Sequence, residues 1–141
     1  MNKSIAAIEQ YLISEGIEYF IDREEESPEL RVKRRGAAGN VYRIRFSAKG
    51  GRKDLSVRVF CLVSGLSEEE RRLVLPLINE YNMKYRFFSV SCDKDGDVNI
   101  RYDFLSDSKA PETCVQEIID RIEMMVDDIY PELRSVLGYE N

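Results

Sequence analysis

Residues 85–104 read YRFFSVSCDKDGDVNIRYDF, two runs of alternating apolar and polar residues on either side of an acidic turn. Such alternation is typical of strands that bury one face. A three-residue turn ending on Gly96 places this glycine in the left-handed conformation that glycine adopts at low cost. The strands then pair Val90 with Ile100, Cys92 with Val98 and Phe88 with Tyr102. A two-residue turn would shift the register by one and spoil the apolar face, so the pattern predicts an antiparallel hairpin with the longer turn.

Outward from this hairpin, apolar periodicity predicts the other elements of the 141-residue chain. We expect helices over about residues 3–15, 67–82 and 111–136, strands over about residues 17–22, 42–46 and 55–63, and a turn at 49–52. Residues 30–35 fit either a short strand or a loop. The predicted order is α-β-β-β-α-β-β-α. The chain is therefore expected to form a single α+β domain over residues 1–141, with helices packed on an antiparallel sheet.

The sequence gives specific predictions for the two longer helices. Ser67 and Glu70 match a capping box at the start of the middle helix, which should end near Asn82. Because proline lacks the backbone N–H, Pro76 is expected to bend this helix, and Pro131 to kink or interrupt the last one. The buried stripe of the middle helix is predicted to contain Leu73, Leu77, Ile78 and Tyr81.

The composition excludes several classes of chemistry. The chain has no histidine, which rules out Ser-His-Asp and Cys-His hydrolysis and histidine-ligated zinc sites. There is no long apolar run, and Glu9 interrupts the N-terminal segment before a signal-peptide core forms, so we expect a cytoplasmic protein without a membrane span. The three cysteines form no C-x-x-C pair. Cys61 and Cys92 are expected to be small buried thiols, and Cys114, beside Glu112, to be unreactive.

Charge is unevenly distributed along the chain. Residues 31–58 carry a net charge of +9, whereas the whole chain carries −5. Arg43 and Arg45 lie on one face of a predicted strand, and Arg58 lies on the next strand. Such a surface could bind nucleic acid, but Tyr42 and Phe46 should point to the opposite face and could not stack with bases beside these arginines. We therefore favour internal charge matching, in which acidic helices lie near the basic strands, and expect no nucleic-acid partner.

Other candidate sites have structural explanations. Asp93, Asp95 and Asp97 lack the glycine and glutamate spacing of an EF-hand calcium loop, so a hairpin turn explains them without a metal. Asn79 and Asn82 share a helix face. They form either a polar recognition pair or an anchor, in which Asn82 ends the helix in a left-handed conformation and Asn79 bonds to nearby backbone. Ser89 and Ser91 have no identifiable base. We expect no catalytic residue, no cofactor and no enzymatic activity.

The second half of the chain also resembles a known family. The resemblance is based on four stretches: INEYN (78–82) at the end of a helix, the aromatic-rich run from Tyr85 to Cys92, the turn Asp95-Gly96, and YPEL (130–133) near the end of the last helix. This pattern, over residues 66–137, is similar to the YbjN-domain family, whose fold resembles bacterial type III secretion chaperones. The resemblance implies a small, acidic, non-catalytic module, chaperone-like or regulatory, which forms a homodimer and binds an unidentified protein partner. The alternative function is nucleic-acid binding through residues 31–58.

Overall fold

The computed structural model describes residues 2–48, 54–105 and 112–139. In this part of the chain three helices and six strands follow one another as α1 (Lys3–Ser14), β1 (Phe20–Ile21), β2 (Leu30–Arg35), β3 (Val41–Ser47), β4 (Asp54–Val63), α2 (Glu68–Lys84), β5 (Ser89–Cys92), β6 (Val98–Leu105) and α3 (Glu112–Val136). The predicted turn at 49–52 and the helix start at Pro111 lie outside the described residues. None of the helices within these ranges combines the length and the apolar character that a membrane crossing requires.

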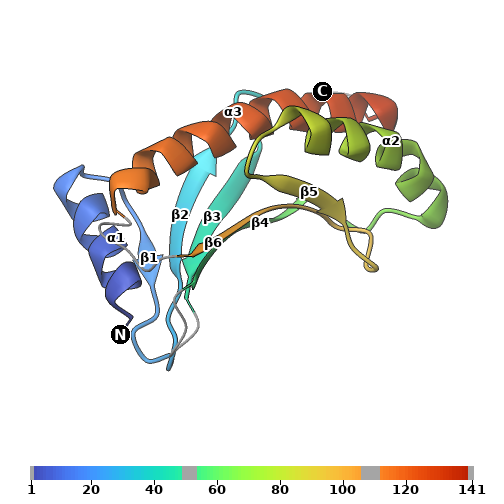
Figure 1. The fold of residues 1–141 in the computed structure, drawn as a ribbon. Coiled ribbons are helices and arrows are strands. Elements are labelled where there is room, and N and C mark those ends of the chain that lie inside the picture. The colour runs from blue at the N-terminus through green and yellow to red at the C-terminus, as the bar shows by residue number, and fades with distance from the viewer. Residues whose placement is uncertain (1, 49–53, 106–111, 140–141) are drawn as a thin grey trace.

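The strands form one antiparallel sheet in the order β1-β2-β3-β4-β6-β5. Figure 1 shows α3 running along one side of this sheet, with α1 near its first turns and α2 beside its second half. The apolar residues of all three helices and of the strand faces beneath them join in a single core. The α+β class with helices packed on an antiparallel sheet is therefore confirmed. On the opposite side of the sheet, which we call the open face, none of the described helices lies (Figure 1).

The predicted hairpin register is confirmed. Val90 pairs with Ile100 and Cys92 with Val98, and Gly96 has a φ of +79°. The amide of Asp93 donates to the carbonyl of Asp97 at 2.9 Å, which closes the three-residue turn. Phe88 lies just before β5, and its ring centre is 5.0 Å from that of Tyr102, as the predicted register requires.

Residues 30–35, which the sequence left open, form strand β2. Leu30 and Val32 are fully buried, whereas Arg31 and Lys33 point to the open face, and all six positions pair with β3. The sheet thus contains one strand more than the coarse predicted order. The first strand is shorter than predicted, since only Phe20 and Ile21 pair with β2.

The predictions for α2 and α3 need two corrections. In the stripe of α2, Ile78 and Tyr81 are buried as predicted and Leu77 is partly buried against the core, whereas Leu73 is 49% exposed and Val74 takes the buried position in its place. Both helices continue through their prolines, so of the two outcomes predicted for Pro131, a kink or an interruption, the interruption does not occur. Ile129 and Leu133 are fully buried on either side of Pro131, and this burial holds the turn in place despite the missing N–H.

Cys61 also differs from the prediction, because it is exposed. Between the pairs Val59–Ile100 and Val63–Val98 the register shifts, and β4 bulges away from β6. Cys61 lies in this bulge with a φ of +58°, and its amide donates to Oδ1 of Asn99 at 2.9 Å. A bulge interrupts the alternation of inward and outward side chains, which a period-two pattern assumes to be unbroken. Cys92, by contrast, is partly buried against the core.

Candidate interaction surface

A row of four arginines crosses the open face. The sheet register places Arg31, Arg45, Arg58 and Arg101 side by side on β2, β3, β4 and β6, and we call these residues the arginine row. Phe20 of β1 continues the row at one end and Ser89 of β5 at the other, so one line of side chains crosses the whole sheet. The row exists because the core-facing neighbours in each strand are apolar, and alternation sends the arginines outward.

Two carboxylates flank the arginine row. Glu29 binds Nε of Arg31 at 2.7 Å and Nη1 of Arg45 at 2.8 Å. Asp103 accepts two hydrogen bonds from Arg58, at 2.6 and 3.1 Å, and lies 3.5 Å from Arg101. The hydrogen bond from Arg58 is the main reason why the pKa of Asp103 lies below its usual value. Like charges on adjacent strands repel each other, and the two carboxylates offset part of that cost.

Two exposed phenylalanines lie on the same face. The guanidinium of Arg31 is 5.5 Å from the ring centre of Phe20, and that of Arg45 is 5.4 Å from the ring centre of Phe60. Phe20 and Phe60 are 56% and 47% exposed, respectively. Tyr42 and Phe46 point into the core, as predicted, but the sequence did not single out Phe20 and Phe60. Phe60 was detectable, because it occupies an outward position in the alternation of its strand.

A second basic pair lies next to the row. Lys33 and Arg43 are opposite each other on β2 and β3, and both are exposed. Together with Arg31, Phe20 and Glu18 they line a shallow hollow of about 400 Å³. Within the described part of the chain, no carboxylate lies within ion-pair distance of Lys33 or Arg43. The structure thus brings Arg43, Arg45 and Arg58 onto one surface, with Arg31, Lys33 and Arg101 added to them.

The positive charges of the basic strands form ion pairs with one helix as well as with carboxylates beside them. Arg34 of β2 lies on the helix-covered side, where its Nε is 3.0 Å from a carboxylate oxygen of Glu123 in α3. On the open face, however, the partners are Glu29, just before β2, and Asp103 of β6. The acidic outer face of α3 is therefore not what neutralises the arginine row.

Asn79 and Asn82 lie apart from the arginine row. The side chain of Asn82 accepts from the amide of Val90 at 2.8 Å and donates to the carbonyl of Val90 at 3.0 Å. Because β5 is an edge strand, its outer backbone groups would otherwise face solvent. The Asn82 side chain forms hydrogen bonds with those of Val90. The expected left-handed end at Asn82 is wrong, because α2 continues to Lys84. Asn79 is exposed, and among the described residues its side chain has one hydrogen bond, from Nδ2 to the sulfur of Met83 at 4.0 Å.

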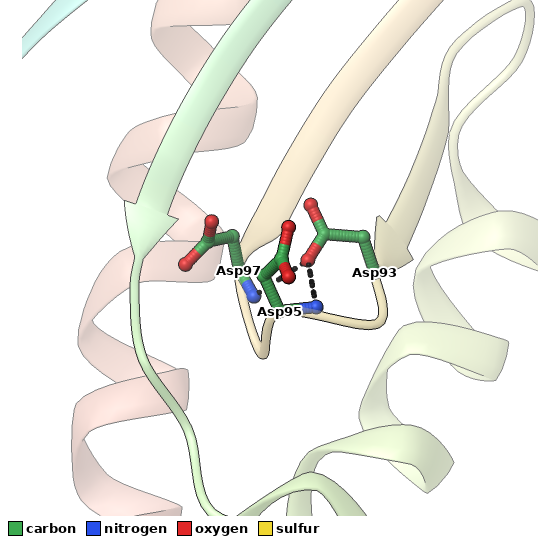
Figure 2. A group of neighbouring side chains, drawn as sticks. All are labelled: Asp93, Asp95 and Asp97. Atoms are coloured by element: carbon green, nitrogen blue, oxygen red, sulfur yellow. Dashed lines mark hydrogen bonds between the residues drawn. The ribbon is translucent and has the colours of Figure 1, made fainter.

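Figure 2 shows the three aspartates of the hairpin turn. The carboxylate of Asp93 accepts from the amides of Asp95 and Asp97, at 2.9 and 3.0 Å, and from the Asn99 side chain at 3.0 Å. The bond from the Asp97 amide is the main cause that lowers the pKa of Asp93. Carboxylate oxygens of the three aspartates lie within 4.8 Å of one another. The hydrogen bonds of Asp93 are those of a tight turn, so the geometry needs no metal to explain it.

The structure also gives the positions of the remaining candidate nucleophiles, Ser89, Ser91 and Cys114. Ser89 and Ser91 are half-buried on the open face of β5, and no described side chain bonds to either hydroxyl. Cys114 is exposed in the first turn of α3, at the rim of a hollow of about 280 Å³ that Phe87 and Tyr102 also line. Phe87 is 61% exposed and has a φ of +72°. Glu117 lines the same hollow as Cys114, but among the described residues no hydrogen bond joins a base to Ser89, Ser91 or Cys114.

Comparisons with known proteins support the fold. A family described as "Putative bacterial sensory transduction regulator" matches residues 4–135. The structure of the Yersinia pestis type III secretion chaperone SycH, in complex with a stable fragment of YscM2, aligns over 93% of this chain and 99% of that chain, with 14% identity and a TM-score of 0.57. An uncharacterized protein from Methanothermobacter thermautotrophicus aligns over 92% and 97%, with 14% identity and a TM-score of 0.51. No curated protein matches the chain.

Proposed function

The chain belongs to the YbjN family, and from this membership and the structure we propose that it is a non-catalytic regulatory module that binds a protein partner through the open face of its sheet. One observation carries the proposal. An exposed sheet face gathers four aligned arginines and two half-exposed phenylalanines in a protein whose net charge is −5. Arginine and aromatic side chains are the types that dominate the binding energy of protein interfaces.

The likeness to SycH supports a binding role rather than a catalytic one. SycH is a chaperone, and its structure was determined with a protein fragment bound. The three cysteines of this chain are free thiols, which fits a reducing compartment, and the proposal places the protein in the cytoplasm. It also treats residues 1–141 as one domain, because all three helices share one core with the sheet. A single cooperative unfolding transition would agree with that assignment.

Quantitative affinity capture from a bacterial lysate tests the function. The wild-type protein is compared with R45S/R58S, which removes two charges from the arginine row, and with K3S/K94S, which removes two exposed charges from α1 and the hairpin turn. We expect specific proteins to be captured by the wild type and by K3S/K94S and to be lost with R45S/R58S. Identical capture by all three forms would contradict binding through the open face.

We further propose that the protein is a homodimer, formed through the solvent side of α2. Leu75 and Met83, eight residues apart and so on one side of this helix, are 46% and 82% exposed, and a second copy would cover them. Light scattering over a range of concentrations measures the mass. L75E should reduce it to that of a monomer, while M124E, at a position of α3 with 53% exposure, should not. A wild-type protein that stays monomeric at all concentrations would exclude the dimer.

A further inference from the structure

We propose that the open face binds an extended, acidic segment of its protein partner, with carboxylates at alternate positions lying along the arginine row. This inference rests on the proposed function, and it adds the chemistry of the partner. The charge of the surface supports it. The arginine row, Lys33 and Arg43 present six cations, and only Glu29 and Asp103 form ion pairs with them among the described residues. The face is left with an excess of positive charge that a partner of opposite charge would neutralise.

The centre of the row favours a carboxylate as the group that binds there. Arg45 and Arg58 are directly opposite each other, but Glu29 binds Arg45 and Asp103 binds Arg58. No described carboxylate binds both arginines, so the repulsion between these neighbouring positive charges is offset only by two separate ion pairs. A carboxylate placed between them would accept hydrogen bonds from both, and charge-assisted bonds of this kind are among the strongest that a surface can form.

The spacing of the row favours an extended segment. Neighbouring strands are about 4.8 Å apart, so the three intervals from Arg31 to Arg101 span roughly 14 Å. In an extended chain, side chains on the same side recur about every 6.8 Å, so three carboxylates at alternate positions also span roughly 14 Å. The hollow beside Phe20 lies at one end of this line, where an apolar side chain of the segment would contact the ring.

The other occupants fit less well. A second copy related by a two-fold axis would place one arginine row against another, which is repulsive. For a nucleic acid, a guanidinium already lies over each of Phe20 and Phe60, so a base could stack only on the remaining side of either ring.

Fluorescence anisotropy with defined probes tests the inference. The first probe is a labelled peptide with three glutamates at alternate positions followed by phenylalanine. The others are a peptide of the same composition with the glutamates consecutive, a peptide with lysines in place of the glutamates, and a single-stranded DNA of similar length. Titrations at about 50 mM and about 300 mM NaCl measure the electrostatic part of the affinity. Wild type, R45S/R58S and K3S/K94S are compared, and K33S/R43S provides a second open-face variant in case the first one folds poorly.

We expect the alternating glutamate peptide to bind the wild type most tightly at low salt, and R45S/R58S to weaken binding by about tenfold or more. K33S/R43S should also weaken it, and K3S/K94S should leave it within about twofold. Equal effects of all three variants would overturn the inference, and so would tighter binding of the DNA with the same dependence on Arg45 and Arg58. If the peptide does not bind but protein capture still depends on these arginines, the inference fails while the proposed function stands.

Discussion

Arg45 on β3 lies directly opposite Arg58 on β4, and a different carboxylate binds each guanidinium, Glu29 that of Arg45 and Asp103 that of Arg58. The two carboxylates stand on the same open face, one near each end of the arginine row. This arrangement makes four adjacent arginines tolerable in a sheet and still leaves the surface basic. The fold therefore presents a concentrated positive charge without depending on the acidic helices behind the sheet.

The ion pair of Asp103 predicts a pH dependence of stability. Because the pKa of Asp103 is lowered in the folded protein, first by the hydrogen bond from Arg58, the pair stabilises the fold above the unfolded pKa of about 3.9. This contribution is lost as the pH falls through the lower native pKa. D103N should cost about 0.5–1 kcal/mol at pH 7, since the pair is partly exposed. Urea denaturation at pH 7 and pH 2 measures the cost, which should nearly vanish at the lower pH. A cost independent of pH would show that the ion pair is not its cause.

Asn82 should contribute more to stability than Asn79. N82A removes two hydrogen bonds to the backbone of Val90 and should lower the free energy of unfolding by about 1–2 kcal/mol. N79A is the matched control, because Asn79 is exposed and its side chain has only a weak hydrogen bond to the sulfur of Met83 among the described residues. Chemical denaturation of both variants checks the prediction. Equal losses would mean that the contact with the edge strand carries little of the stability.

Gly96 should tolerate no side chain. A Cβ at this position would lie 2.4 Å from the carbonyl oxygen of Leu66, and the φ of +79° disfavours any L residue. G96A should therefore destabilise the protein by about 2–4 kcal/mol. Gly39 has a φ of +86°, but a Cβ added there would meet no atom within 4 Å beyond its chain neighbours, so G39A should cost only about 1 kcal/mol. Thermal and urea unfolding compare the two, and a larger loss with G39A would contradict the contact with Leu66.

Cys61 offers a substitution that should stabilise the fold. Its φ of +58° is strained for a residue with a side chain, and the thiol is exposed, so little packing is lost on its removal. C61G should keep the bond from the amide to Asn99 and raise the free energy of unfolding by about 0.5–1 kcal/mol. C114A, at an exposed helical position, should be nearly neutral. A clear loss of stability in C61G would show that the Cys61 side chain packs usefully in the bulge.

The aspartate turn should not respond to calcium. The carboxylate of Asp93 already accepts three hydrogen bonds, from two backbone amides and Asn99, and a bound cation would have to compete with them. We expect addition of calcium chloride, or of a chelator, to leave the thermal midpoint unchanged. Isothermal titration calorimetry provides an independent readout. Stoichiometric heat that disappears in D95N/D97N would establish a metal site.

The sequence predicted most reliably what depends on neighbours along the chain. The turn Asp93–Asp97 set the hairpin register, because only one loop length keeps Val90 opposite Ile100. Prediction from the sequence failed where contacts with distant parts of the chain override a local preference. Pro131 stays inside α3 because Ile129 and Leu133 are buried on both sides of it. The alternation in β4 could not reveal the bulge at Cys61, since a bulge depends on how β6 pairs with that strand.

For the candidate surface, the sequence alone determined that Arg43, Arg45 and Arg58 point away from the core, because alternation in a strand assigns each side chain to a face. Which arginines become neighbours depends on the order of the strands in the folded sheet. Strand β6 inserts between β4 and β5, and this brings Arg101 beside Arg58 and lets Asp103 bind both of them. Side-chain direction follows from local backbone geometry, whereas the order of strands follows from packing of the whole core, which no periodicity in the chain encodes.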